Sequence, residues 1–231
     1  QHPVTFFEAT TAAAFVAFAA RQADVTLLEV GMGGRLDATN IIPNTKLCLF
    51  TPISLDHTEY LGNTLALIAA EKAAINKPGA ICISAPQKPE AEAVLKEAMP
   101  ELIIADVNYV KNDLSLAGEH QKINANLAAE AAKTIGISER AVQRGMTTAK
   151  WKARMQLLEK GPLAGCWLDG AHNEGGAEVV AKHLAKNNSK PWVIITGMMR
   201  TKDARAYFRH FIGKLKGIYT IKVPGEDKSR D

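Results

Sequence analysis

The residues best suited to chemistry in this 231-residue chain lie at the ends of two apolar runs. Glu29 lies near the end of "DVTLLEV", and Asp56 and His57 follow "TKLCLFTPIS". If both runs are parallel strands, their carboxyl ends share the edge of the sheet where ligands bind. A carboxylate and an imidazole there would suit a magnesium or manganese ion. The spacing alone equally allows Glu29 to cap a helix and His57 to make a structural hydrogen bond.

Two further stretches carry polar residues with more than one possible role. The stretch "AAEKAAINKPG" places Glu71 and Lys72 in a predicted helix, where they could be solvated charges. A lysine whose pKa falls on burial could instead add carbon dioxide and become a carbamate that binds a metal. In "LDGAHNEGG", Asp169 and His172 lie between a predicted strand and a predicted helix N-terminus. That place suits an anion or a nucleotide ribose, and also a simple capped turn.

The glycine-rich loop "GMGGRLDATN" does not match the common nucleotide-binding motifs. A dinucleotide fingerprint, G-x-G-x-x-G/A, needs a small residue where Leu36 stands, which disfavours an NAD-linked oxidoreductase. The sequence contains no G-x-S-x-G, the motif of a nucleophile elbow. It also contains no G-x-x-x-x-G-K-[ST], so no phosphate-binding P-loop is found in it.

The composition is that of a globular protein, with 47% hydrophobic and 23% charged residues. The net charge is +4 and the basic residues are scattered, which favours small anionic substrates over nucleic acid. No apolar run has the length of a membrane span, and the first residues lack the basic region of a signal peptide, so we expect a cytoplasmic protein without a membrane partner. The cysteines lie in apolar runs and are expected to be inert core thiols rather than disulfide or zinc ligands. They are Cys48, Cys82 and Cys166.

The order of the predicted elements indicates an α/β fold. Thr5 and Glu8 have the spacing of a capping box, ahead of a helix that is apolar on most faces and expected to be buried. Short apolar strands and amphipathic helices then alternate, which predicts a mostly parallel sheet covered on both faces. The strands are predicted at 24–31, 45–54, 79–85 and 101–107, and the helices at 64–76 and 89–99.

A helical region from Asp113 to Met146 separates this series from a second one. Its helices are predicted at 118–136 and 138–146, with Ser138 as the cap of the second. The second series alternates strands at 165–173, 191–199 and 218–223 with helices at 174–187 and 202–217. We therefore predict a domain boundary near Lys150, between domains at 1–150 and 151–231.

Taken together, these stretches resemble the folylpolyglutamate synthase/dihydrofolate synthase family of the Mur ligase superfamily. The resemblance rests on segments in the family order: "FFEATTAAAF", "LEVGMGGRLDATN", "SLDHTEYLGNT", "IAAEKAAINKPG", "GEHQKINANLAAEAA", "WKARMQ", "LDGAHN" and "ITGMMRTKD". It implies a Mur-ligase-type ATPase domain at 1–150 and a smaller Rossmann-like glutamate ligase domain at 151–231, both incomplete. It also implies an ATP-dependent ligase that phosphorylates a carboxylate and joins it to the amine of L-glutamate.

The resemblance implies a metal site. Glu29 and His57 match the family's magnesium ligands, and Lys72 matches its carbamylated lysine, whose carbamate binds a second metal. Mg²⁺ would spread the charge that develops on the phosphoryl group transferred from ATP. These three residues are thus the implied catalytic and metal-binding residues.

The resemblance also implies substrate contacts. Nucleotide contacts fall on Asn124, Arg154 and Asp169. Contacts with the other substrates, dihydropteroate or folates and L-glutamate, fall on Gly33, Gly34, Leu36 and His172. The bare backbone of the glycine loop is expected to let metal and substrate approach closely. The implied partners are small molecules only, and the chain is expected to be a monomer.

The sequence departs from the family pattern at several points. The family's P-loop lies upstream of "HPVTFFE", so the sequence is expected to begin inside the ATPase domain, without the P-loop serine that binds magnesium. The stretch between Val110 and Gly118 is short, and the second domain is expected to lack its last strands. "WKAR" replaces the usual W-P-G-R but keeps Arg154, and Ala74 stands where glycine is usual. Two alternatives stay open: another Mur-type amino acid ligase, or a catalytically inactive folate-binding remnant.

Overall fold

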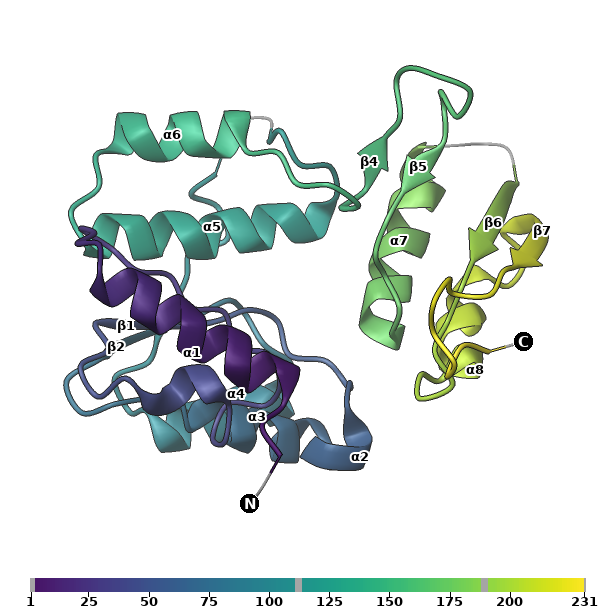
Figure 1. The fold of residues 1–231 in the computed structure, drawn as a ribbon. Helices are drawn as coiled ribbons and strands as arrows, with labels where there is room; N and C mark the ends of the chain where they lie inside the picture. The colour runs from purple at the N-terminus through teal and green to yellow at the C-terminus, as the bar shows by residue number, and fades with distance from the viewer. Residues whose placement is uncertain (1–2, 111–113, 188–190, 231) are drawn as a thin grey trace. The chain divides into compact units, whose positions relative to one another are not determined.

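The computed structural model describes residues 3–110, 114–187 and 191–230, which form two units (Figure 1). The first unit comprises the described residues up to Ile53 and those from His57 to Ile104. The second comprises Ser54–Asp56 and the described residues from Ala105 onward. The domain boundary near Lys150 stays a prediction. The predicted start of the helical region at Asp113 and part of the stretch that follows Val110 lie outside the described residues.

The first helix, α1 (Phe6–Ala19), begins at the predicted capping box. The hydroxyl of Thr5 accepts a hydrogen bond from the Glu8 amide at 3.2 Å, and the Glu8 carboxylate accepts one from the Thr5 amide at 2.8 Å. The expected burial of this helix is wrong, because none of its residues is buried and Phe6 is 85% exposed. A helix that is apolar all round needs neighbours on every side. Among the described elements, α1 packs mainly against the short 3-10 helix η1 (Ala38–Ile41).

The strand predicted at 24–31 does not form. The segment has strand-like composition, but a strand also needs a hydrogen-bonded neighbour, and no described residue pairs with it. Its apolar side chains lack cover as a result, and Leu27 is 85% exposed. Glu29 therefore lies on an irregular segment that leads into the glycine loop rather than at the end of a strand.

The other three strands of the first series are confirmed. β1 (Leu47–Phe50), β2 (Ile81–Ser84) and β3 (Ile103–Ile104) form a parallel sheet in the order β1-β2-β3. The predicted helices are also present, as α3 (Leu65–Ala73) and α4 (Pro89–Ala98), with a short α2 (Thr58–Leu61) before them. The sheet and these helices enclose a buried apolar core. Its residues are Cys48, Phe50, Ile53, Ile68, Ala69, Ala73, Cys82, Ala91, Leu95 and Met99.

The second unit contains the remaining elements. The two predicted helices of the helical region are α5 (Glu119–Thr134) and α6 (Glu139–Thr148), and Ser138 caps the second as predicted. A small antiparallel pair follows, β4 (Gln156–Leu157) and β5 (Trp167–Leu168). Cys166, next to β5, is exposed, so its prediction as a core thiol is wrong. A two-stranded ribbon this short has no core of its own in which to bury a thiol.

The last elements are α7 (Glu174–Asn187), β6 (Trp192–Thr196), α8 (Ala204–Phe208), the 3-10 helix η2 (Arg209–Phe211) and β7 (Leu215–Thr220). β6 and β7 pair in parallel, next to α7 and α8 (Figure 1). Phe211 lies in the core of this part of the unit and is 1% exposed. The helix predicted at 202–217 is shorter, because Gly213 takes a positive φ of 75° and the next residues pair with β6. No helix in the described part of the chain combines the length and the apolar character needed to cross a bilayer.

Candidate functional site

The glycine loop is packed directly on the helix that carries Lys72. A Cβ atom added at Gly34 would lie 2.6 Å from the backbone oxygen of Glu71 and 3.1 Å from the Cα of Lys72. The amide of Arg35 donates a hydrogen bond to the same Glu71 oxygen at 3.1 Å. Gly34 is buried, so only a residue without a side chain allows this approach. The bare backbone at this position thus serves the packing of the loop on α3.

Charged side chains fix the same loop. The Arg35 guanidinium contacts the Glu71 carboxylate at 2.6 Å. Asp37 accepts hydrogen bonds from the amides of Gly31 and Met32 at 2.9 and 3.0 Å, through one carboxylate oxygen. Its other oxygen accepts from the amide and hydroxyl of Thr39. Burial raises the pKa of Asp37, but these hydrogen bonds outweigh it and hold the pKa below its ordinary value.

The loop also contacts the helix that begins after His57. A Cβ atom at Gly33, where φ is 68°, would lie 2.9 Å from the side chain of Leu61 in α2. His57 is the N-cap of α2, and its carbonyl accepts hydrogen bonds from the amides of Tyr60 and Leu61. The segments that carry Glu29, His57 and Lys72 therefore meet around Gly33 and Gly34. All of these residues belong to the first unit.

His57 has a left-handed backbone conformation, with φ 50° and ψ 38°. Few residues other than glycine adopt this conformation, although histidine does so more often than most. Such strain persists where the surrounding structure holds the residue in place, and it is frequent at functional sites. The backbone at this position therefore agrees with a functional role for the imidazole.

The donor types of this region fit Mg²⁺. Glu29 offers a carboxylate and His57 an imidazole, and both side chains are exposed. Mg²⁺ keeps several water ligands and needs only one or two protein ligands, so these donors suffice in number. The described residues contain no group of three or more histidine, cysteine, aspartate or glutamate side chains arranged for a metal. Lys72, which is partly buried, would add a ligand only as a carbamate.

A second cluster, in the second unit, is built around Asp56. Its carboxylate contacts the ammonium of Lys202 at 2.6 Å and accepts a hydrogen bond from the Asn173 amide group at 2.8 Å. The side chains of Lys202 and Asp56 are only 15% and 23% exposed, so this ion pair is largely withdrawn from water. The Nε2 atom of His172 lies 3.8 Å from the same carboxylate. We call Asp56, His172, Asn173 and Lys202 the Asp56 cluster.

His172 is held between two acceptors. Its Nδ1 atom lies 2.9 Å from the carbonyl oxygen of Gly170, and its Nε2 atom faces Asp56. The interaction with Asp56 raises the pKa of His172 above its ordinary value, against the opposing effects of burial and of the Lys202 charge. The site thus stabilises the imidazolium form, a cation suited to binding a carboxylate.

A third group of residues surrounds Asp169, also in the second unit. Its carboxylate accepts hydrogen bonds from the amides of Met155 and Ala171 at 2.7 and 2.8 Å. Ala153 and Met155 have positive φ values of 54° and 44°, on either side of Arg154. Asp169 therefore stabilises the strained turn that presents the Arg154 side chain.

His120, on α5, belongs to the same group. Burial lowers the pKa of His120, Asp169 acts in the opposite direction, and Arg154 lowers it further. Both charges therefore act on the imidazole of His120. His120 precedes Asn124 by four residues, so both face the same side of α5. Asn124, Arg154 and Asp169, the three predicted nucleotide contacts, all belong to the second unit, and their role stays a prediction.

Sequence reasoning missed several of these residues. Asp56 lies next to His57 in the sequence, but its position alone indicates no role for it. Lys202 lies 146 residues from Asp56 in the chain, and no local pattern joins them. His120 could have been found from its spacing with Asn124. Leu36, predicted at the pterin substrate, is 87% exposed and is therefore accessible to a ligand.

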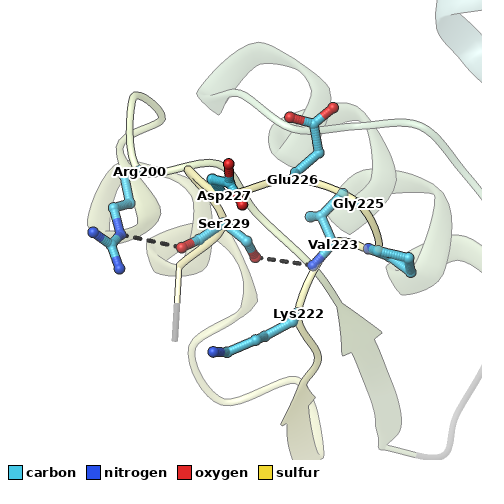
Figure 2. A pocket seen from close by; sticks show the side chains of 8 residues that line it. Arg200, Lys222, Val223, Gly225, Glu226, Asp227 and Ser229 are labelled. Atoms are coloured by element: carbon cyan, nitrogen blue, oxygen red, sulfur yellow. Dashed lines mark hydrogen bonds between the residues drawn. The ribbon is translucent and has the colours of Figure 1, made fainter.

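A pocket of about 410 Å³ lies elsewhere in the second unit (Figure 2). It is formed by the loop from Lys222 to Ser229 together with Arg200. Ser229 closes this loop, because its hydroxyl accepts a hydrogen bond from the Val223 amide and its carbonyl accepts one from Arg200. None of the predicted site residues lines this pocket.

The curated relatives that match this chain in sequence are folylpolyglutamate and dihydrofolate synthases. No protein-family model matches the chain. The dihydrofolate synthase/folylpolyglutamate synthase of Bacillus subtilis is 33% identical over 230 residues, which cover 84% of this chain and 53% of that protein. The folylpolyglutamate synthase of Lacticaseibacillus casei is 27% identical over 259 residues, which cover 98% and 60%.

Solved structures agree with these relatives. An FPGS–AMPPCP–folate complex matches with a TM-score of 0.88 and 28% identity, over 96% of this chain and 62% of that one. The Mycobacterium tuberculosis folylpolyglutamate synthase complexed with ADP and AMPPCP matches with a TM-score of 0.86 and 28% identity, over 99% and 59%. The chain spans about three fifths or less of the length of these proteins. The α/β Mur-ligase-type fold class is confirmed. Over the part of these proteins that it spans, the chain is similar in sequence and in fold to the folylpolyglutamate synthase/dihydrofolate synthase family.

Proposed function

We propose that the chain acts in the ATP-dependent addition of L-glutamate to dihydropteroate or to reduced folates. The observation that carries this proposal is its match, in sequence and fold, to a structure described as holding both an ATP analogue and folate. In this reaction ATP phosphorylates a carboxylate, and the amine of glutamate displaces phosphate from the acyl phosphate. The proposed substrates are small molecules. We also propose that the protein acts in the cytoplasm and as a monomer.

Glu29 and His57 would hold Mg²⁺, and a carbamate formed on Lys72 would hold a second ion. When bound, Mg²⁺ supplies positive charge to the phosphoryl group during its transfer. The residues of this chain have the task of fixing the ligands. The packing of Gly34 on α3 and of Gly33 on Leu61 supports this role, because it sets the distance between the three ligand-bearing segments.

Asn124, Arg154 and Asp169 would contact the nucleotide, with His120 beside them. The strained turn at Arg154 supports this assignment, because the partly buried carboxylate of Asp169 holds the backbone that carries the guanidinium. Gly33, Gly34 and Leu36 would line the path of the pterin or folate substrate. The exposed side chain of Leu36 offers an apolar contact for a flat ring system.

His172 would bind a carboxylate of L-glutamate. Its raised pKa supports this role, because a cationic imidazole attracts an anion more strongly than a neutral one. Lys202 and Asn173 hold Asp56, and Asp56 in turn orients the imidazole. Catalysis also needs groups that bind the phosphates of ATP, and the sequence contains no P-loop motif to supply them. The assay therefore uses the protein purified from its own cells.

The test is ATP-dependent incorporation of labelled L-glutamate into dihydropteroate and into tetrahydrofolate, with a muramyl acceptor as the comparison. We expect incorporation with one or both pterin acceptors, and release of one phosphate for each amide formed. Lys72→Ala should abolish incorporation, because the carbamate cannot form, whereas Lys133→Ala on α5 should retain it. Incorporation only with the muramyl acceptor, or full activity of Lys72→Ala, would contradict the proposal. Folate binding without incorporation would favour the inactive folate-binding remnant.

A further inference from the structure

Two buried cysteines lie directly opposite each other in the parallel sheet of the first unit. Cys48 of β1 and Cys82 of β2 are register partners, and β1 and β2 are neighbours in the sheet (Figure 1). Adjacent strands are separated by about 4.8 Å, and disulfides need Cα atoms about 4.4–6.8 Å apart. Both side chains belong to the core that the sheet forms with α3 and α4. The backbone therefore has the spacing that a disulfide needs, and both side chains lie in the same core.

Both thiols contact the segment that directly follows α3, the helix that carries Lys72. The Cys48 sulfur lies 3.4 Å from the carbonyl oxygen of Ile75, and the Cys82 sulfur lies 3.2 Å from the side-chain oxygen of Asn76. Cys48 and Cys82 are 3% and 6% exposed. An oxidant must therefore be small, or reach the sulfurs during a local opening of the sheet edge.

The surroundings of the two thiols are not equivalent. A hydrogen bond from the Cys82 thiol lowers the pKa of Cys48, burial opposes this, and the backbone amide and charge of Lys77 lower it further. The same hydrogen bond and burial raise the pKa of Cys82. Cys48 is thus the thiol that ionises first and becomes the nucleophile, while Cys82 keeps its proton.

We propose that Cys48 and Cys82 are a redox-active pair that hydrogen peroxide, a small two-electron oxidant, converts to a disulfide. The Cys48 thiolate attacks one peroxide oxygen, the O–O bond breaks, and hydroxide leaves, which yields a sulfenic acid on Cys48. The Cys82 sulfur then attacks Cys48, and the sulfenic oxygen leaves as water with the Cys82 proton. Two electrons pass from the two sulfurs to the peroxide, and a dithiol reverses the change by thiol–disulfide exchange.

The disulfide would close a loop that contains both His57 and Lys72. It would also change the Cys82 sulfur, which lies 3.2 Å from the side-chain oxygen of Asn76. The pair is thus placed to link the redox state of the surroundings to the segment that follows the Lys72 helix. This inference stands on the sheet register and does not depend on the proposed ligase activity.

The experiment uses the Cys166→Ser variant, which removes the exposed thiol and keeps the pair. The protein is treated with a few equivalents of hydrogen peroxide, denatured with iodoacetamide, and measured by intact mass. We expect a loss of about 2 Da with both thiols protected from alkylation, reversed by dithiothreitol. Tryptic digestion should give one cross-linked species that joins peptides 47–72 and 73–96, each of which contains one cysteine.

Single variants test the order of the steps. In Cys82→Ala, the sulfenic acid on Cys48 has no partner and should be trapped by dimedone. In Cys48→Ala, Cys82 should react with peroxide at least tenfold more slowly. The inference would be overturned if iodoacetamide still alkylated both thiols after peroxide treatment. It would also be overturned if each cysteine gained oxygen separately and no cross-link formed. Dimedone trapping on Cys82 instead of Cys48 would overturn the assignment of the nucleophile.

Discussion

Single residues decide how the glycine loop meets α3. Gly34→Ala would place a methyl group 2.6 Å from the Glu71 carbonyl oxygen, a backbone atom that cannot rotate away. We expect a loss of about 1–3 kcal/mol in the free energy of unfolding, measured by urea denaturation of the purified chain. Gly145→Ala in α6 is the control, because its Cβ would meet nothing within 4 Å and alanine favours a helix. Equal stability of the two variants would show that the loop can move away from α3 at little cost.

The charge state of His172 is a second property of individual side chains. Its pKa is raised from the ordinary value of 6.5, so the imidazolium form is favoured in the folded state. The resulting stabilisation is complete below the unfolded pKa and is lost as the pH rises through the higher folded pKa. NMR titration of the imidazole should therefore give a midpoint above 6.5.

Two substitutions should move this midpoint in opposite directions. Asp56→Asn removes the main interaction that raises the pKa of His172 and should lower the midpoint. Lys202→Met removes a repelling charge and should raise it. Shifts of both variants in the same direction would mean that the Asp56 cluster rearranges when one of its members is replaced.

At the scale of elements, α1 depends on its cap more than on packing. Thr5→Ala removes the hydroxyl that accepts from the Glu8 amide and should cost roughly 1 kcal/mol, seen as weaker helical circular dichroism and a lower urea midpoint. Thr10→Ala is the matched control, because this hydroxyl only bonds back to the carbonyls of Phe6 and Phe7 within the helix. If both variants behaved alike, the capping box would contribute nothing specific.

Element types could be predicted where local pattern and pairing agree. The runs around Cys48, Cys82 and Ile103 became strands because each has a neighbour in one parallel sheet. The run at 24–31 has the same composition, yet pairing is a non-local requirement that composition does not encode. The burial of α1 failed for the same reason, since periodicity shows which faces are apolar but not what covers them.

Across the whole molecule, the candidate site could be predicted only where motifs are local. The motif around Gly33 and Gly34 predicted a special loop, and the structure gives the physical reason in its contact with α3. The contact of Asp56 with Lys202 joins residues 146 positions apart, and no local sequence pattern encodes it. The roles of Glu29, His57 and Lys72 in metal binding stay predictions. They are supported by the contacts of Gly33 and Gly34, through which the segments that carry these residues pack together.

The exposed helix α1 has a consequence for motion. Its 14 residues include none that is buried, whereas α3 contributes Ile68, Ala69 and Ala73 to the core. A helix held by its own hydrogen bonds and a cap can open while the sheet behind it stays closed. The backbone amides of α1 would then exchange with solvent long before those of α3, so α1 can unravel and re-form while the core beneath α3 stays closed.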